Sequence, residues 1–377
     1  MFPQLDPSEA RFLAEIIVSI FGVVFFLGLA LWMIRRKQAA KPGEPTPAPA
    51  SLPETAELKA MNPDEQSDRV TALLQEYQTW KKERLLRGED GNSLFIRTGV
   101  EKNGLRYQLV ASTQVQALAI YLSTLMAEND PQASVQAEAL FASVLAYPAY
   151  RNNELSSWKY LPDLPRSPKL DPDPHAEAWL IYLLVMATKR WPTIDRFHYS
   201  ELIPTRLQAL QEYAETLAPE MTAQLSFSGF LTHQLINLDP SLDWSALGES
   251  REQFFNLFVE HEYFTSETVL RKLGLNLLQM GMLALFDHDL QAIQALHKMQ
   301  ADLVEFVEEW LVGLQAEPEF SRSAMLACAV PALLNLEVKE LNERVWEALL
   351  NSQPDKDDGL GATLKVLGMV FLAGHRE

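Results

Sequence analysis

The sequence is poor in several residue types and motifs that common protein functions require. It contains one cysteine, Cys328, which excludes an internal disulfide framework, and it lacks both zinc-type Cys/His spacing and a glycine-rich phosphate loop. Basic residues are fewer than acidic ones, 32 against 50, for a formal net charge of −18. Because nucleic acids and anionic surfaces require a basic face, we expect no nucleic-acid partner for the body of the chain. We also expect no metal and no cofactor.

The chain also lacks any run of alternating apolar and polar residues. From Glu65 onward nearly every window carries apolar residues at helical spacing, except the irregular stretch Glu89–Leu109 with its glycines. We therefore predict an all-α body over residues 65–377, without a short repeat. The expected helices are Arg69–Arg87, Thr113–Met126, Pro131–Leu145, His175–Trp191, Ser200–Leu217, Ser250–Glu260, Ser266–Phe286, Leu290–Leu314, Ser321–Leu334, Val338–Leu349 and Gly361–Ala373.

One long apolar run precedes this body. Ile16–Ile34 carries no charge and is long enough to cross a bilayer, with no basic stretch before it as a signal peptide would have. We predict a short extracytoplasmic N-terminus over residues 1–15, a transmembrane helix over 16–34, and a basic, proline-rich linker over 35–64. The cations Arg35, Arg36 and Lys37 follow the run, so the positive-inside rule predicts a single-pass protein of the bacterial inner membrane with a cytoplasmic body.

The segment Asp171–Trp191 organises the body. Asp173 is a plausible N-cap, Glu177 falls in the first turn, and apolar residues follow at helical spacing. Such a pattern predicts a buried helix with polar side chains at its N-terminal end.

This segment resembles the signature of glycoside hydrolase family 8. The apolar frame keeps the family register, while the two aspartates of the signature read His175 and Glu177 here. Further landmarks lie in family order at Leu109–Leu118, Ser157–Lys159, Ser226–Phe230 with Asp239–Trp244, Thr268–Arg271 and Gly359–Gly374. The resemblance implies a closed, toroid-like (α/α)6 barrel whose N- and C-terminal helices are adjacent.

The same resemblance implies that the catalytic carboxylates are lost. The family's general acid, sugar-binding aspartate and base fall on Ser112, His175 and Thr268. A serine hydroxyl is too weak an acid to protonate a leaving group, and a threonine is no general base unless something activates it. We therefore expect no catalytic residue, with Glu177 and Glu267 as fallback candidates.

The family alignment also implies a cleft at one end of the ring. The expected cleft and substrate-binding residues are Gln114, Trp158, His175, Glu177, Trp179 and Arg271. Arg271 is the expected partner of Glu177, and such a pair would lower the pKa of that carboxyl. Trp158 and Trp179 are the aromatic side chains expected to stack on a sugar.

Three hypotheses for function follow. The first is an inactive, membrane-anchored subunit with a structural, regulatory or saccharide-binding role in an exopolysaccharide (cellulose-like) synthesis or export system, with protein partners there and a β-glucan oligosaccharide as ligand. The alternative is an active, inverting endo-β-glycanase with relocated carboxylates. The third is a helical scaffold that no longer binds sugar. Family 8 enzymes normally work outside the cytoplasmic membrane, so a periplasmic body is the alternative location.

Overall fold

The computed structural model describes residues 63–88, 91, 93–103, 106–150, 152–162, 169–191, 199–216, 270–313 and 321–374. They belong to one compact unit, Asn62–Glu377. The expected transmembrane helix Ile16–Ile34 and the linker lie outside the described residues. Among the helices that the structure does describe, none has the length and apolar character needed to cross a membrane.

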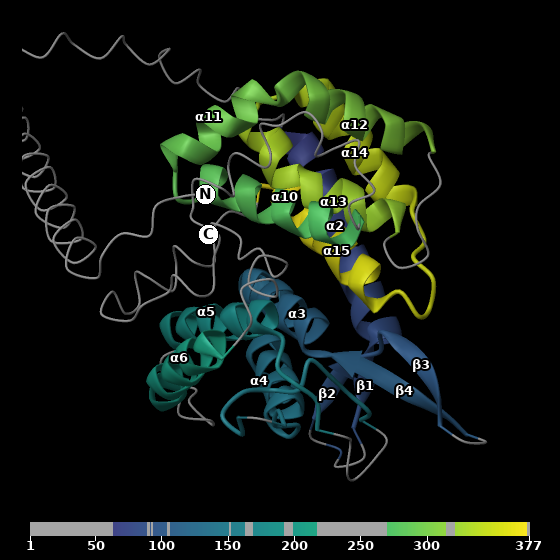
Figure 1. Ribbon diagram of the computed structural model, residues 1–377. Helices are drawn as coiled ribbons and strands as arrows, with labels where there is room; N and C mark the ends of the chain where they lie inside the picture. The colour runs from purple at the N-terminus through teal and green to yellow at the C-terminus, as the bar shows by residue number, and fades with distance from the viewer. Residues whose placement is uncertain are drawn as a thin grey trace, which may run out of the picture. The chain divides into compact units, whose positions relative to one another are not determined.

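Helices make up most of the described chain (Figure 1). They are α2 (Pro63–Arg84), α3 (Thr113–Leu125), the short 3-10 helix η1 (Met126–Glu128), α4 (Ala133–Leu145), α5 (Pro174–Arg190), α6 (Tyr199–Glu215), α10 (Leu270–Leu285), α11 (Leu290–Lys298), α12 (Gln300–Val312), α13 (Arg322–Asn335), α14 (Lys339–Asn351) and α15 (Gly359–Leu372).

The helices form two layers. In the first, α10 packs on α13, α13 on α15, α15 on α3 and α3 on α5. Nearly every residue of α3, α13 and α15 is buried, which is why these helices are apolar around their whole circumference. Two glycines allow close approach within this layer, because a Cβ at Gly281 would lie 2.4 Å from the Ala332 nitrogen and one at Gly368 would lie 2.9 Å from the Ala327 Cα.

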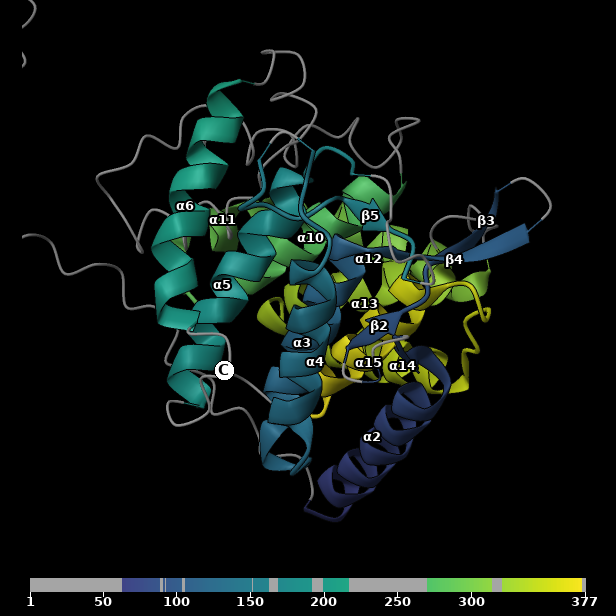
Figure 2. The ribbon, with the colours of Figure 1, turned by 90° about the horizontal axis from the view of Figure 1, so that it is seen from below.

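The second layer is amphipathic. Helix α4 packs on α3, α6 on α5, and α14 on α13 and α15 (Figure 2). In α14 the buried residues Leu341, Val345 and Leu349 recur every four positions, so one face meets the first layer and the other meets solvent. Helix pairs of this kind are the arrangement expected from the family resemblance.

The first and last described helices are adjacent, as predicted. Helix α2 packs on α15, where the Trp80 indole nitrogen donates to the Thr363 hydroxyl at 3.2 Å. The Lys365 ammonium, which is buried, donates to a Glu76 carboxylate oxygen at 2.7 Å. Closure of the expected ring would involve residues 217–269, which lie outside the described residues.

The body expected to be all-α contains one region of strands, most of it in the stretch Glu89–Leu109 that the sequence marks as irregular. Five short strands lie around the start of α3: β1 (Leu85–Arg87), β2 (Leu94–Ile96), β3 (Gly99–Asn103), β4 (Arg106–Ser112) and β5 (Lys159–Tyr160). β1 pairs with β2, and β4 lies between β3 and β5, all antiparallel. Strands this short, separated by turns, offer too few residues for an alternating pattern to be recognised.

Two helix boundaries also differ from the prediction. The expected helix Leu290–Leu314 is broken at Met299 into α11 and α12, because Met299 leaves helical geometry with φ −95° and ψ 7°. Apolar spacing continues through the break, so the sequence does not reveal it. The expected helix Arg69–Arg87 ends at Arg84, and its last three residues form β1 instead. The expected helix Ser250–Glu260 lies outside the described residues.

Candidate functional site

A groove of about 610 Å³ lies where the N-terminal ends of α3 and α15 meet the β3–β4 hairpin. Ser112 lines it as the N-cap of α3, its hydroxyl accepting a 3.4 Å hydrogen bond from the Val115 amide. The other polar and aromatic side chains that line the groove are Thr98, Glu101, Trp158, Lys159, Asp355, Asp357 and Asp358. Ser112, which the sequence resemblance aligns with the family's general acid, therefore borders a groove, but its hydroxyl caps a helix.

Trp158 forms one wall of this groove with 44% of its surface exposed. Its backbone is held from two sides: the amide donates to the Asp171 carbonyl at 3.1 Å, and the carbonyl accepts from the Thr113 amide at 3.0 Å. The Lys159 ammonium lies 4.8 Å from the Trp158 ring centre and pairs with Glu101. An exposed aromatic ring on a fixed backbone, beside hydrogen-bonding side chains, is suited to binding a molecule with apolar faces and polar edges.

Three aspartates that line the groove were not identified from the sequence. Asp357 pairs with Arg97 at 2.5 Å, and the Asp358 carboxylate caps α15 by accepting from the Gly361 amide at 2.7 Å. Asp355 also lines the groove. Their signal was the acidic run immediately before Gly359, where a helix starts.

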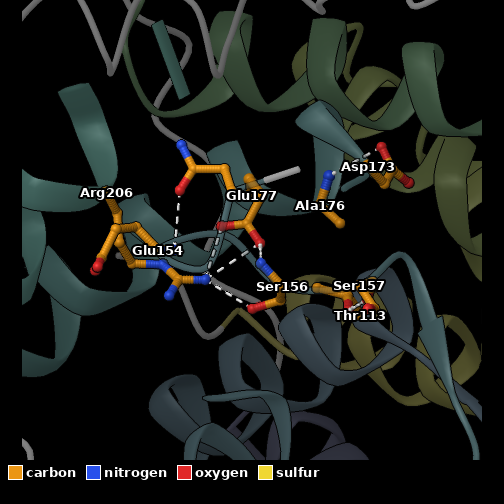
Figure 3. A network of polar contacts seen from close by, with 9 residues as sticks. Thr113, Glu154, Ser156, Ser157, Asp173, Ala176, Glu177 and Arg206 are labelled. Atoms are coloured by element: carbon orange, nitrogen blue, oxygen red, sulfur yellow. Dashed lines mark hydrogen bonds and ion pairs between the residues drawn. The ribbon is translucent and has the colours of Figure 1, made fainter. Parts of the chain in front are cut away.

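Glu177 lies in a different environment, inside the protein. It is fully buried, and its carboxylate accepts from the Ser156 amide at 2.6 Å and from the Arg206 guanidinium at 2.8 Å (Figure 3). The same Arg206 nitrogen donates to the Ser156 hydroxyl at 2.7 Å. Arg206, on α6, is itself only 4% exposed. The three residues form a closed cluster that joins α5, α6 and the segment before β5.

This cluster gives Glu177 a partner that was not expected and corrects the expected direction of its pKa shift. Glu177 pairs with Arg206, whereas the expected partner was Arg271. The backbone of Arg271 is in the first turn of α10, but its side chain lies outside the described residues. The pKa of Glu177 is raised by burial, against the opposing effect of Arg206 and of the Ser156 hydrogen bond, where a lowered pKa was expected. Burial is complete because α5 and α6 pack together over the pair.

Gln114 and His175 occupy the first turns of α3 and α5. His175 is partly buried, and its Nε2 lies 2.7 Å from the amide nitrogen of Gln279 on α10. Gln114 is 5% exposed and is absent from the residues that line the groove around Ser112. The structure therefore places His175, which the sequence resemblance aligns with the family's sugar-binding aspartate, against the buried amide of Gln279.

Trp179 is a core residue, which corrects its assignment to the cleft. It is 1% exposed and packs against Tyr121 and Tyr182, with ring centres 5.5 and 6.0 Å away. Tyr182 is buried in the same cluster. Because α5 is buried on nearly all sides, its aromatic side chains fill the space between helices instead of facing a groove.

The structure thus separates the expected site residues. It brings Ser112 and Trp158 to one groove and puts Glu177 and Trp179 in the interior. Thr268 and Glu267 lie outside the described residues. Within the part of the chain that the structure describes, no group of three or more His, Cys, Asp or Glu side chains is placed to hold a metal ion.

Arg206 is the residue of the cluster that sequence reasoning missed. A signal existed, because Arg206 lies in the apolar stripe of its helix, between Leu202 and Leu210 at spacings of four residues. An arginine on the buried face of a helix requires a buried acceptor, and the nearest unexplained acid on the neighbouring helix was Glu177.

Comparisons with known proteins bear on the fold. No protein-family model matches the sequence, and no curated protein sequence matches it. The apo β-1,3-1,4-glucanase from Paenibacillus sp. X4 is similar in structure with a TM-score of 0.66 and 12% identity, over 83% of this chain and 93% of that one. A cold-adapted family 8 xylanase is similar with a TM-score of 0.52 and 12% identity, over 84% and 94%.

A third similar structure is a mutant of Rex8A from Paenibacillus barcinonensis complexed with an arabinofuranosyl-xylotetraose. Its TM-score is 0.56 at 14% identity, over 81% of this chain and 92% of that one. Agreement over most of both chains at such low identity is agreement of fold. The layered helices described above therefore have the fold of the family 8 glycoside hydrolases, as the resemblance in sequence implied.

Proposed function

We propose that this protein binds a neutral, β-linked polysaccharide in the groove at Ser112 and Trp158 and does not cleave it. The observation that carries the proposal is the groove itself, which joins an exposed tryptophan to the position of the family's general acid. The structurally similar enzymes are a β-1,3-1,4-glucanase and xylanases, which act on β-linked glycans.

The chemistry of the groove suits a sugar chain. A pyranose ring presents a face of C–H groups that packs on an aromatic ring, and hydroxyls at its edge that hydrogen-bond to polar side chains. Trp158 supplies the ring, and Lys159, Glu101 and Asp355 supply polar groups around it. Four acidic side chains line the groove, which disfavours a polysaccharide rich in carboxylates.

The absence of cleavage rests on Ser112, where the resemblance puts the family's general acid, and on Glu177, a fallback candidate for a relocated carboxylate. An inverting glycosidase needs an acid and a base about 6.5–9.5 Å apart, both reaching the scissile bond. Ser112 is a helix-capping hydroxyl, and Glu177 is a buried carboxylate that a substrate in the groove cannot contact. Of the aspartates in the groove, Asp357 pairs with Arg97 and Asp358 caps α15.

The test is calorimetric titration with xylotetraose and with a β-1,3-1,4-linked glucotetraose, beside an assay for reducing-sugar release. We expect binding without release, and about tenfold weaker binding for Trp158→Ala, the size of loss typical of removing an aromatic anchor. The matched control is Tyr150→Ala, which removes an aromatic side chain that is 70% exposed and absent from the groove lining. Unchanged affinity in Trp158→Ala contradicts the proposal.

One observation favours the alternative of an active enzyme. Asp355, Asp357 and Asp358 line the same groove as Ser112, so relocated carboxylates are present near the family's acid position. Release of reducing sugar by the wild type, abolished in Asp355→Asn or Asp357→Asn, would establish this alternative. Failure of the wild type to bind either oligosaccharide would favour a scaffold without sugar binding.

We also propose that the chain is anchored in the bacterial inner membrane and serves an exopolysaccharide system. The support is the uncharged run Ile16–Ile34 with Arg35, Arg36 and Lys37 behind it. A C-terminal fusion to alkaline phosphatase, which folds only in an oxidising compartment, tests the orientation. An inactive fusion is expected for a cytoplasmic body, whereas an active one supports the periplasmic alternative.

A further inference from the structure

We infer that Glu177 and Arg206 are positioning residues that hold the loop carrying Trp158 in the conformation that presents its ring to the groove. The inference rests on the proposed function, because it assigns Trp158 a ligand. It gives the second aspartate position of the signature a role distinct from catalysis: the carboxylate acts through the backbone of Ser156 instead of touching a sugar.

The contact between the ion pair and the loop is direct. Glu177 accepts a 2.6 Å hydrogen bond from the Ser156 amide, and Arg206 donates to the Ser156 hydroxyl at 2.7 Å. Ser156 lies two residues before Trp158 and is itself 2% exposed. Figure 3 shows Ser156 between the ion pair and Ser157, so the pair meets the loop at its buried end.

The rest of the loop is bonded just as closely. The Ser157 amide donates to the Tyr147 carbonyl at 2.9 Å, and the Ser157 carbonyl accepts from the Thr113 hydroxyl at 2.6 Å. With the bonds of Trp158 to Asp171 and Thr113, the amides of three successive residues, 156 to 158, are all paired. A loop with this many bonds carries its exposed ring on a rigid support, and rigidity lowers the entropy lost on binding.

The charged pair is the part of this support that contributes most to rigidity. Two buried charges stay together because separating them leaves each in a medium that solvates it poorly. Any motion of the loop that moves Ser156 away removes a hydrogen bond from both charges at once. Neutral hydrogen bonds alone hold a loop less strongly, since charge-assisted bonds are about twice as strong as neutral ones.

The test replaces the pair without leaving an isolated charge. Glu177→Met with Arg206→Met substitutes side chains of similar length, a change of the kind that buried ion pairs tolerate in stability. The matched control is Glu128→Met with Arg190→Met, which removes an exposed ion pair between η1 and the C-terminal end of α5. Both double variants of the 377-residue chain are purified in detergent with fluorinated tryptophan. The Trp158 resonance is assigned with Trp158→Phe.

Two readouts are then compared. In the Glu177/Arg206 variant we expect the Trp158 fluorine resonance to shift and broaden, and the affinity for the oligosaccharide bound by the wild type to fall about tenfold, as in Trp158→Ala. The Glu128/Arg190 control is expected to change neither. A Trp158 resonance with wild-type position and width in the Glu177/Arg206 variant overturns the inference, whatever the affinity.

The outcomes separate this inference from the proposed function. If Trp158→Ala weakens binding while the Glu177/Arg206 variant binds like the wild type, positioning is wrong and the groove assignment stands. If Trp158→Ala leaves binding unchanged, the groove assignment fails, and the resonance alone decides whether the pair holds the loop. If the double variant does not fold, Ser156→Ala, which removes only the hydroxyl that Arg206 contacts, is judged by the same two readouts.

Discussion

Two tryptophans with similar expectations have opposite environments. Trp158, in the loop before β5, is 44% exposed and lines the groove, whereas Trp179, in the second turn of α5, is 1% exposed and lies among Tyr121 and Tyr182. Of the side chains that the resemblance placed in the cleft, Glu177 and Trp179 on α5 are buried in the interior, whereas Trp158 lines the groove together with Ser112.

The largest expected effect is that of Trp179→Ala, which tests the interior half of this contrast. Removing a buried indole leaves a cavity, and we expect the free energy of unfolding to fall by about 4 kcal/mol. Urea denaturation followed by circular dichroism measures it. Trp158→Ala is the control and should stay within about 0.5 kcal/mol of the wild type, because the side chain is exposed. Equal costs for the two changes would contradict the assignment of one tryptophan to the core.

A somewhat smaller loss is expected for Arg206→Met, which leaves the Glu177 carboxylate buried without its counter-charge. We expect a loss of about 3 kcal/mol in the free energy of unfolding. The matched change is Arg190→Met, which breaks the exposed pair with Glu128 and should cost less than about 1 kcal/mol. If Arg206→Met costs no more than Arg190→Met, the cluster at Glu177 is solvated and could be reached by a substrate.

The pH dependence of stability should distinguish Glu177 from Asp130, another buried carboxylate. Burial alone would raise the pKa of Asp130, but hydrogen bonds from Lys81, the Gln132 amide and Tyr77 outweigh it and hold that pKa below its ordinary value. Asp130 therefore stabilises the fold above the unfolded-state pKa of about 3.9, and this contribution is lost as pH falls through the folded-state pKa. Asp130→Asn should cost about 2 kcal/mol at pH 7 and less in acid.

Glu177 should behave in the opposite way. Because burial raises its pKa, the folded state holds the proton more tightly than the unfolded state, and stability falls as pH rises from about 4.3 through the folded-state pKa. The cost of Glu177→Gln should therefore shrink with rising pH, while that of Asp130→Asn grows. Unfolding free energies of both variants between about pH 2 and pH 8 measure the two slopes, because the Asp130 contribution changes mainly below pH 4. Slopes of the same sign would contradict the difference in environment.

The sequence predicts the layered helices well because a helix that is buried on all sides is rich in apolar residues along its length. α3, α13 and α15 are apolar through their length, and Asp173 and Pro174 mark the start of α5 by an N-cap with hydrogen bonds to the His175 and Ala176 amides. A position within a fully buried helix, however, does not reveal which neighbour it meets. The residues around Glu177 do not predict its partner, because the signal for Arg206 lies on another helix, in the apolar stripe of α6. The exposure of Trp158 depends on hydrogen bonds of its loop, which local spacing does not predict.

The smallest expected effect concerns Ser112, and it tests the groove half of the contrast. Ser112→Ala removes the N-cap of α3, which should cost about 1 kcal/mol in the free energy of unfolding. Ser321 is a matched control, since its hydroxyl caps α13 through a hydrogen bond of the same 3.4 Å length, to the Ala324 amide. We expect Ser112→Ala and Ser321→Ala to lose similar stability by urea denaturation. Only Ser112→Ala should change oligosaccharide affinity, because Ser112 lines the groove and Ser321 is absent from its lining. If both variants lose the same affinity, the loss of affinity results from the loss of stability that they share. The glycan then does not lie in the groove at Ser112.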